Sequence, residues 1–249
     1  MSFLNIFKSK IPEQNYSVLN TDLHSHFIQG IDDGCKNLEE SIELLKVMLL
    51  CGFRSVVCTP HVQFEYYRNT PDIILSSFDI LQNKAMHEIP EITLYAAAEY
   101  LIDEGFHNQI QQGLLSFGKK KYVLVELSFF TPFPKYKNLL QEMLMKGYTP
   151  VLAHPERYGY WDVNDSSFED LRLAGVEMQL NIPSLCGYYG SEIQKRAVSL
   201  IENGIITCLG TDVHNLNYMN VVQDGLKQKR LQKLLNDKSF INSTVFTNE

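Results

Sequence analysis

The sequence lacks several features that would mark a membrane, extracellular or nucleic-acid-binding protein. It has no run of 18 apolar residues, and therefore no candidate membrane span. Its five cysteines form no C-x-x-C pair, which argues against a disulfide framework or a zinc knuckle and favours a reducing, cytoplasmic location. It has no run of more than three basic residues, and its formal net charge of −7 disfavours a nucleic-acid partner, because phosphate backbones attract cationic surfaces.

Two catalytic signatures are also missing. No cysteine is followed by arginine at C-x5-R spacing, which excludes the cysteine-nucleophile phosphatases, and no G-x-S-x-G motif is present. The composition is that of an ordinary globular protein, with 45% hydrophobic and 20% charged residues in 249. A chain of this length buries a sufficient core without covalent staples.

Short apolar runs rich in β-branched residues alternate with segments of helical spacing. Seven such strand–helix units predict one α/β domain with a parallel sheet, either closed as a barrel or open. We expect strands at 17–23, 55–58, 92–98, 122–127, 149–153, 176–180 and 205–209. We expect helices at 37–52, 70–87, 103–112, 136–146, 167–174, 191–203 and 219–236.

Imidazole and carboxylate side chains gather where these strands end. Six of the seven strand–loop junctions carry at least one, in DLHSH, IDDG, CTPH, AAAEY, LVELS, LAHPERY and GTDVH, and the carboxyl ends of barrel strands meet at one face. A single such residue is more often structural, but nine together predict a metal site. Nitrogen and oxygen donors without thiolate suit Mn, Fe or Zn, and the number fits three divalent ions. The candidate ligands are His24, His26, Asp33, His61, Glu99, Glu126, His154, Asp212 and His214. His87 and His107 fall on helices and are interpreted as surface or structural residues.

These motifs resemble those of the PHP (polymerase and histidinol phosphatase) superfamily. More specifically, HSHFIQGIDDGCKNLEESIELL, AHPERY and DVHN are similar to the bacterial tyrosine phosphatases of the CpsB/CapC family, which are encoded with capsule and exopolysaccharide genes. The resemblance implies a single-domain, distorted (β/α)7 TIM-like barrel at residues 20–249, after an N-terminal extension at 1–19. It also implies that the nine candidate ligands hold three divalent ions, with Mn²⁺ the expected metal and Fe or Zn the alternatives.

The implied activity is hydrolysis of phosphotyrosine by a metal-bound hydroxide, with a tyrosine autokinase of polysaccharide assembly as the expected substrate. Arg157 follows His154 by three residues and is predicted to clamp the phosphate, although a structural ion pair is the alternative. Arg68, in the loop after His61, is a second candidate for phosphate contact. Aromatic residues in these loops suit an aromatic phosphoester. They are Tyr66, Tyr67, Phe129, Phe130, Phe133, Tyr158, Tyr160, Trp161, Tyr188 and Tyr189.

Other functions stay open at this point. One is a small-molecule phosphomonoesterase such as histidinol-phosphate phosphatase, and another is a low-turnover regulator that binds a kinase. The apolar cluster of Phe3, Leu4, Ile6 and Phe7 would pack on the barrel or a second subunit, or attach the protein to the inner face of the membrane. The sequence alone does not decide the oligomeric state.

Overall fold

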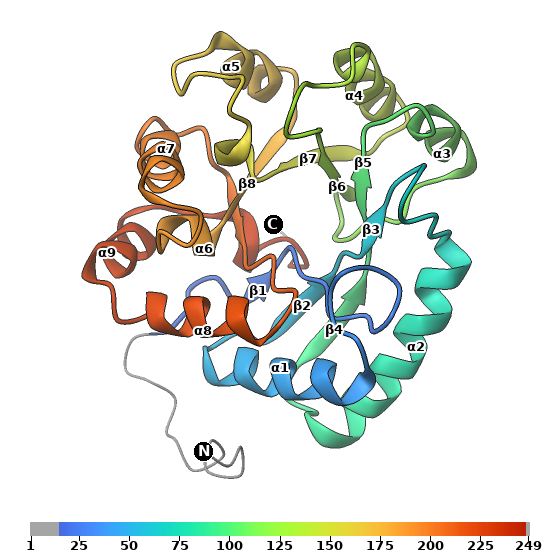
Figure 1. Ribbon diagram of the computed structural model, residues 1–249, viewed down its shortest axis with the longest axis vertical. Helices are drawn as coiled ribbons and strands as arrows, with labels where there is room; N and C mark the ends of the chain where they lie inside the picture. The colour runs from blue at the N-terminus through green and yellow to red at the C-terminus, as the bar shows by residue number, and fades with distance from the viewer. Residues whose placement is uncertain (1–14, 248–249) are drawn as a thin grey trace.

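The computed structural model describes residues 15–247, which form a ring of strands surrounded by helices (Figure 1). The predicted apolar cluster at residues 3–7 lies outside the described residues. One sheet contains β1 (Thr21–Asp22), β2 (Ser55–Cys58) and β4 (Thr93–Ala96) in that order. The other contains, in order, β3 (His61–Val62), β5 (Glu99–Leu101), β6 (Tyr122–Glu126), β7 (Thr149–Ala153), β8 (Glu177–Asn181) and β9 (Cys208–Gly210).

The two sheets together occupy seven strand positions, because two of the strands are interrupted. β2 resumes as β3 after two residues, β4 resumes as β5 after two residues, and both halves pair in parallel with their neighbours. An isolated parallel bridge between Ser25 and Val213 joins the first position to the last. The His26 amide donates to the Val213 carbonyl at 3.0 Å beside this bridge. The predicted distorted (β/α)7 barrel is therefore confirmed.

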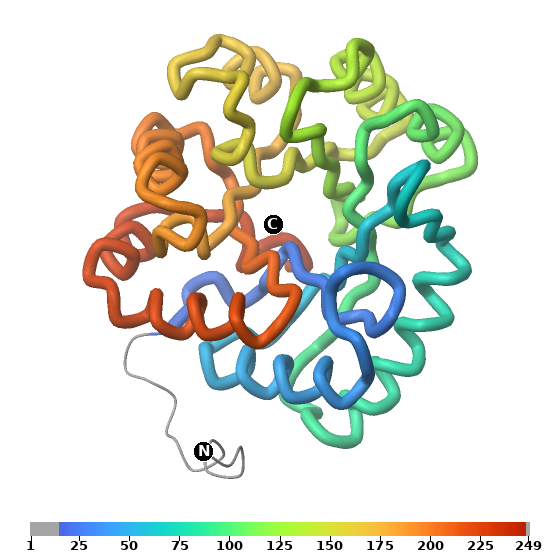
Figure 2. The backbone as a smooth tube through the Cα atoms, viewed as in Figure 1, coloured from blue at the N-terminus to red at the C-terminus, as the bar shows by residue number. Residues whose placement is uncertain are grey.

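Helices follow each strand position, and the chain winds around the ring in one direction (Figure 2). They are α1 (Leu38–Leu50), α2 (Pro71–Glu88), α3 (Phe106–Gln112), α4 (Tyr136–Met145), α5 (Ser166–Leu173), α6 (Ile182–Leu185), α7 (Ser191–Glu202), α8 (Leu216–Gly225) and α9 (Lys229–Asp237), with 3-10 turns at Pro155–Arg157 and Ile241–Ser243. N-cap residues explain why the first residues of α1 and α2 were predicted well. The Asn37 side chain accepts from the Glu40 amide, and Thr70 caps a helix that opens with Pro71. None of the helices in residues 15–247 is long and apolar enough to cross a bilayer.

Several predicted elements are wrong in extent. The strand expected at 205–209 is Cys208–Gly210, the strand expected at 92–98 ends at Ala96, and the helix expected at 103–112 begins only at Phe106. Two further differences have a clear physical cause. The single helix expected at 219–236 is two helices, because α8 ends at Gly225, a poor helix former, and α9 begins at Lys229. Gly225 packs so closely that a Cβ there would lie 2.5 Å from Cys186 Sγ. The strand expected at 17–23 is reduced to Thr21–Asp22, because Asn20 adopts a left-handed φ of 60° that breaks the extended chain.

The described part of the predicted N-terminal extension packs against the barrel. Tyr16 is fully buried, its ring stacks on Phe53 with centroids 5.4 Å apart, and its hydroxyl donates to the Val222 carbonyl at 2.8 Å. Leu19 is also buried in the same hydrophobic cluster. Residues 15–19 are therefore part of the folded body, and the boundary predicted after residue 19 stays a prediction.

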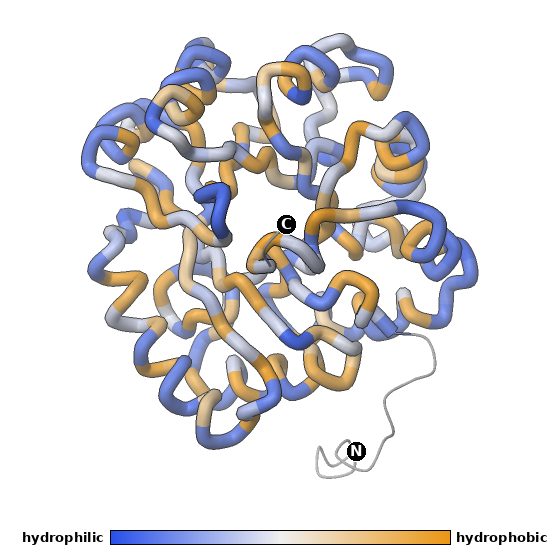
Figure 3. The backbone as a smooth tube through the Cα atoms, turned by 180° about the vertical axis from the view of Figure 1, so that it is seen from behind, coloured by the Kyte–Doolittle hydropathy of each residue, from blue (hydrophilic) through white to orange (hydrophobic). Residues whose placement is uncertain are grey.

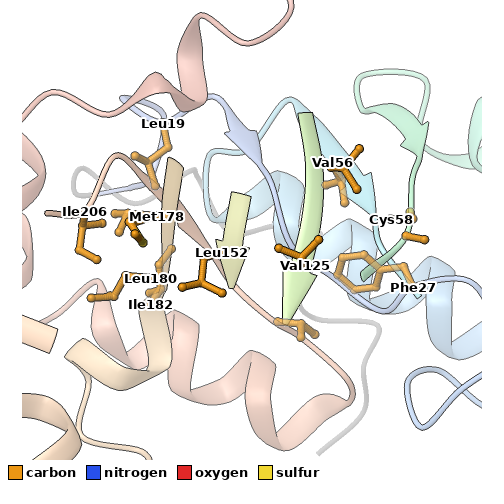
Figure 4. Packing of buried hydrophobic residues seen from close by; sticks show 14 of the residues in the cluster. Leu19, Phe27, Val56, Cys58, Val125, Leu152, Met178, Leu180, Ile182 and Ile206 are labelled. Carbon is orange, nitrogen blue, oxygen red and sulfur yellow. The ribbon is translucent and has the colours of Figure 1, made fainter. Parts of the chain in front are cut away.

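The core has two layers, as expected of a barrel whose strands are buried on both faces. The larger layer lies between strands and helices, where Figure 4 shows Cys58, Val125 and Leu152 from three different strands. The inner layer fills the barrel with side chains that alternate with these, including Val57 and Leu124. Figure 3, seen from behind, shows hydrophobic residues along the central strands and hydrophilic residues at many of the outer turns. The barrel interior is therefore packed, which leaves the loops at the strand ends to form a site.

Candidate metal centre

The nine predicted ligands lie at one end of the barrel. His24 and His26 follow β1, Glu126 ends β6, and His154 follows β7. Asp33 lies further along the loop after β1, and Asp212 and His214 follow β9. Contrary to expectation, Glu99 and His61 do not follow complete strands but begin the short strands β5 and β3, which continue β4 and β2 toward the same end. The interruption places both side chains inside the ring rather than on its rim.

Glu99 lies at the centre of the cluster and is fully buried. Its Oε2 atom lies 3.1 Å from His24 Nε2, 3.5 Å from His26 Nε2 and 3.1 Å from His61 Nδ1. Its Oε1 atom lies 3.1 Å from His154 Nε2. One carboxylate thus faces four imidazoles, an arrangement suited to bridging cations.

Asp212 forms a second contact point for His24 and His26 and also approaches His214. Its Oδ1 atom lies 3.2 Å from His24 Nε2, 3.3 Å from His26 Nε2 and 3.5 Å from His214 Nδ1. The Asn181 amide donates to Asp212 Oδ2 at 2.7 Å, which fixes the carboxylate. The pair of buried carboxylates therefore encloses the His24 and His26 rings.

The two remaining carboxylates differ in exposure. Asp33 Oδ1 is 3.5 Å from Nε2 of both His61 and His214, and 54% of its side chain is exposed. Glu126 lies 3.4 Å from His61 and 3.8 Å from His154, and it is almost fully buried. Both side chains line a cavity of about 260 Å³ that opens above the buried ligands.

The chemistry of the donors fits divalent metal ions. Three groups of side chains each bring their donor atoms within 4.8 Å of one another. The groups are His26, Asp33, His61 and His214; then His24, His26 and Asp212; then His61, Glu99 and Glu126. Glu99 Oε2 and His61 Nδ1 are buried and satisfy no hydrogen bond, although they lie close together. Nitrogen and oxygen donors that converge without hydrogen-bond geometry are what first-row divalent ions bind.

The charges at the site perturb the pKa values of its members. Burial alone would lower the pKa of His61, but Glu99 and Glu126 outweigh it and raise the pKa to about 9. Burial alone would raise the pKa of Glu99, but the surrounding imidazoles hold it well below its usual range. A hydrogen bond from His214 lowers the pKa of Asp33 to about 2. The pKa values of His24 and His26 are raised as well, so without bound cations the proton-bound forms of these three imidazoles are favoured beside the carboxylates, and metal ions would replace their protons.

A second layer of polar residues, which sequence reasoning missed, orients the histidines. Asp32 Oδ2 lies 2.8 Å from His26 Nδ1 and also accepts from the His61 amide at 3.1 Å. Gln179 Oε1 lies 2.9 Å from His24 Nδ1. With Nδ1 engaged on the outside, both rings turn Nε2 toward the centre. The only signal in the sequence was the doubled aspartate of IDDG, from which we selected Asp33 alone.

Backbone conformation also serves the site. His154 and Asp212 have left-handed φ values of 35° and 53°, which non-glycine residues rarely adopt. Gly34 lies so close to the strand that a Cβ there would be 2.3 Å from the His26 carbonyl oxygen. Only glycine therefore allows the loop that carries Asp32 and Asp33 to fold back over His26.

The two predicted phosphate-binding arginines lie in different places. Arg157 is in the 3-10 turn after His154 and lines the metal cavity, with its Nη1 atom 3.8 Å from Asp212 Oδ2. Arg68 lines a neighbouring cavity of about 290 Å³, and its Nε donates to the Phe64 carbonyl at 3.0 Å. The structure therefore brings Arg157, but not Arg68, to the candidate ligands.

The predicted aromatic rim divides into two sets. Tyr158 and Trp161 are buried and pack the loops over the barrel, whereas Phe129 and Tyr66 are exposed. Tyr67 stacks on His61 with centroids 5.5 Å apart. Tyr218, which was not singled out in the sequence, lines the metal cavity. His87 and His107 are exposed and lie on helices, as predicted.

Comparisons with known proteins agree with this geometry. A family model described as capsular polysaccharide synthesis, CpsB/CapC, matches residues 20–237. Tyrosine-protein phosphatase YwqE of Bacillus subtilis is 30% identical over 201 residues, which cover 80% of this chain and 79% of that protein. Tyrosine-protein phosphatase CpsB of Streptococcus pneumoniae is 28% identical over 218 residues, which cover 84% and 90% of the two chains.

Solved structures show the same fold. One belongs to a study of YwqE from Bacillus subtilis and CpsB from Streptococcus pneumoniae, described as unique metal-dependent tyrosine phosphatases. It superposes with a TM-score of 0.77 at 25% identity and covers 92% of this chain and 96% of that one. Histidinol phosphate phosphatase from Lactococcus lactis is more distant, with a TM-score of 0.51 at 14% identity over 84% of this chain and 92% of that one, which shows a shared fold alone. From the family match over most of its length, together with the cluster of nine candidate donors, we conclude that this chain belongs to the CpsB/CapC family.

Proposed function

We propose that the protein is a metal-dependent protein-tyrosine phosphatase that regulates capsular or exopolysaccharide synthesis. One observation carries the proposal: five imidazoles and four carboxylates converge below a single cavity whose wall includes the Arg157 guanidinium. Family membership, and relatives that are named tyrosine phosphatases, support this activity.

The nine donors hold three divalent ions, with Mn²⁺ the first candidate and Fe or Zn the alternatives. The three donor groups described above support this number. When bound, such ions lower the pKa of water and neutralise phosphoryl oxygens. The protein contributes by holding the donors in place: Asp32 and Gln179 fix the ring orientation of His26 and His24, and Asn181 fixes Asp212.

Arg157 supplies the phosphate-binding group of the chain itself. Its planar fork matches two oxygens of a phosphoryl group, and it keeps its charge at every relevant pH. Because a tyrosyl phenoxide has a pKa near 10, it departs more easily than an alkoxide, so the reaction makes less demand on a general acid. Arg68 lies in the adjacent cavity and is a candidate for contact with the rest of a bound phosphoprotein.

The substrate is a phosphotyrosine protein, and a bacterial tyrosine kinase of polysaccharide assembly is the first candidate. Such a partner places the enzyme in the cytoplasm, near the inner face of the membrane. A nucleic-acid substrate is disfavoured by the net charge of −7. No observation in the structure favours histidinol phosphate or a purely regulatory role.

The test compares two substrates and two metal states. Metal-depleted protein is reloaded with Mn²⁺, Fe²⁺ or Zn²⁺, and its hydrolysis of a phosphotyrosine peptide and of histidinol phosphate is measured with and without chelator. We expect chelator-sensitive hydrolysis with a clear preference for the peptide. Hydrolysis that survives complete metal removal contradicts the metal proposal, and preference for histidinol phosphate contradicts the substrate. Metal-loaded protein that hydrolyses neither supports a binding role.

A further inference from the structure

Arg157 is flanked by two aromatic rings. Its Cζ atom lies 4.3 Å from the centroid of Phe129 and 4.3 Å from the centroid of Tyr189. Phe129 comes from the loop after β6 and Tyr189 from the loop after α6, so the two rings reach the guanidinium from separate segments. Both distances are well within the range of favourable cation–π contact.

The hydrogen-bonding edge of the same guanidinium is unpaired. Within residues 15–247, its side-chain nitrogens donate no hydrogen bond, and their one ion-pair partner, Asp212 Oδ2, is 3.8 Å away. Only 25% of the Arg157 side chain is exposed, and the residue lines the metal cavity. A largely buried cation with unfilled donors is costly to maintain, and its geometry suits an anionic ligand.

Both rings are linked to a candidate metal ligand, Phe129 directly and Tyr189 through Tyr218. The Phe129 ring lies 5.5 Å from the ring of His154. The Tyr189 hydroxyl donates to the Tyr218 hydroxyl at 3.0 Å, and the Tyr218 ring lies 5.3 Å from the ring of His214. The position of the guanidinium is therefore linked to the position of the metal donors through two aromatic contacts.

We propose that Phe129 and Tyr189 are positioning residues that hold the Arg157 guanidinium, with its donor edge free, where the phosphoryl oxygens of the substrate arrive. This inference rests on the proposed phosphatase function and extends it to two residues outside the metal site. The rings act by their faces on Arg157 and need no contact with substrate. The Tyr189 hydroxyl contributes less to holding the guanidinium than the Tyr189 ring does, because cation–π attraction depends on the aromatic face.

Phe129 offers a competing explanation, because 42% of it is exposed and its ring could instead stack on the tyrosyl ring of the substrate. The two explanations differ in one respect. A ring that binds the substrate matters with or without Arg157, whereas a ring that acts through Arg157 matters only while Arg157 is present. A double-mutant cycle separates them.

The kinetic experiment measures kcat and KM on an aryl phosphate, and the inhibition constant of inorganic phosphate, for the metal-loaded protein. We expect Phe129→Leu and Tyr189→Leu each to lower kcat/KM by about 3- to 30-fold, to weaken phosphate inhibition similarly, and to have no further effect in an Arg157→Ala background. Tyr189→Phe should retain most of the activity. Phe246→Leu is the matched control, because this ring stacks on Tyr95 at the other end of the barrel. Equal losses with and without Arg157, or unchanged phosphate inhibition, overturn the proposal.

A second readout does not depend on activity. In ¹⁵N-arginine-labelled protein, the Arg157 side-chain resonance, assigned as the one missing in Arg157→Ala, should be shifted upfield by the ring currents of its neighbours. Phe129→Leu and Tyr189→Leu should each reverse part of the shift, and Phe246→Leu should not. If metal-loaded protein proves inactive but the shift is present, the phosphatase proposal fails while the aromatic positioning of Arg157 stands. A resonance at the unperturbed position refutes the positioning itself.

Discussion

Asp32→Asn is the substitution that most directly tests how the fold prepares the metal site. The two carboxylate oxygens of Asp32 receive three N–H groups: Oδ2 those of His26 Nδ1 and the His61 amide, and Oδ1 that of the Gly34 amide at 2.9 Å. An asparagine of the same shape offers only one oxygen. In either orientation its NH₂ group faces an N–H donor, so at least one buried donor loses its acceptor.

The expected magnitude follows from this count. A buried donor without an acceptor costs about 1–3 kcal/mol, and loss of a carboxylate behind a metal-ligating histidine typically weakens metal binding by roughly 10- to 100-fold. Burial lowers the pKa of His26, but the Asp32 carboxylate and other nearby groups raise it above its usual value. The substitution removes the Asp32 charge and therefore part of this stabilisation of the His26 ring. We therefore expect metal affinity to fall by about 10- to 100-fold while the protein still folds.

Competition with a chromophoric chelator measures the affinity, and denaturant unfolding of the metal-free protein measures the stability. Asp103→Asn is a close control, because Asp103 has the same local pattern: Oδ1 accepts from the Gly105 amide at 2.9 Å and Oδ2 from the Phe64 amide at 2.8 Å. Asp103 contacts no histidine, so its variant should lose stability without losing metal. Should Asp32→Asn bind metal as tightly as the unsubstituted protein, Asp32 would not orient the ligand as we infer.

Three further predictions concern the phosphate clamp, the pH dependence and the packing of the first described residues. Arg157→Ala should lower turnover on an aryl phosphate at least about tenfold with metal content unchanged, because the guanidinium binds phosphoryl oxygens; unchanged kinetics would remove it from the mechanism. Metal loading should release protons, because Glu99 helps raise the pKa of His61 to about 9 and the ligand form is neutral. Affinity should therefore increase as pH rises toward 9, which calorimetry in buffers of different ionisation enthalpy can check; proton-independent loading would contradict it. Tyr16→Phe should cost about 1 kcal/mol of unfolding free energy through the lost bond to the Val222 carbonyl and leave turnover unchanged, and equal stability would show that the bond contributes nothing.

The sequence was most informative where one local signal sufficed. The strands at 55–58 and 149–153 and the capped helix after Asn37 have the predicted bounds to within a residue or two, because apolar runs and capping residues act over short distances. The ends of the strands also predicted which residues gather at one face. Parallel strands share a direction, so polar residues at their carboxyl ends meet without further information.

What could not be predicted depends on contacts between distant segments. The interruption at Thr59-Pro60 places His61 at the start of a new strand. Because proline has no N–H for a sheet ladder, the sequence could have indicated a break there. The pairing of β3 with β5 that follows the break is visible only in the fold. The choice between Asp32 and Asp33 depends on which of them faces His26, and the motif IDDG does not show this. Gln179 reaches His24 from 155 positions away along the chain.

The backbone at His154 and Asp212 shows that the site is maintained against a local preference. Left-handed φ values at non-glycine residues cost of order 1 kcal/mol or more each, and they persist only where surrounding contacts determine them. The surrounding contacts are present: the Asp212 amide donates to the His24 carbonyl at 2.7 Å, and the Arg157 amide donates to the His154 carbonyl at 2.9 Å. Both turns direct a candidate ligand inward and begin the loop that carries the next functional residue, Arg157 in one case and His214 in the other. Asn20 and Lys121 also have left-handed φ values, so such strain is not confined to the site, but of these four residues only His154 and Asp212 carry a candidate metal ligand. At these two positions the strained turn is what aims the ligand, so the local cost is linked to the geometry of the site.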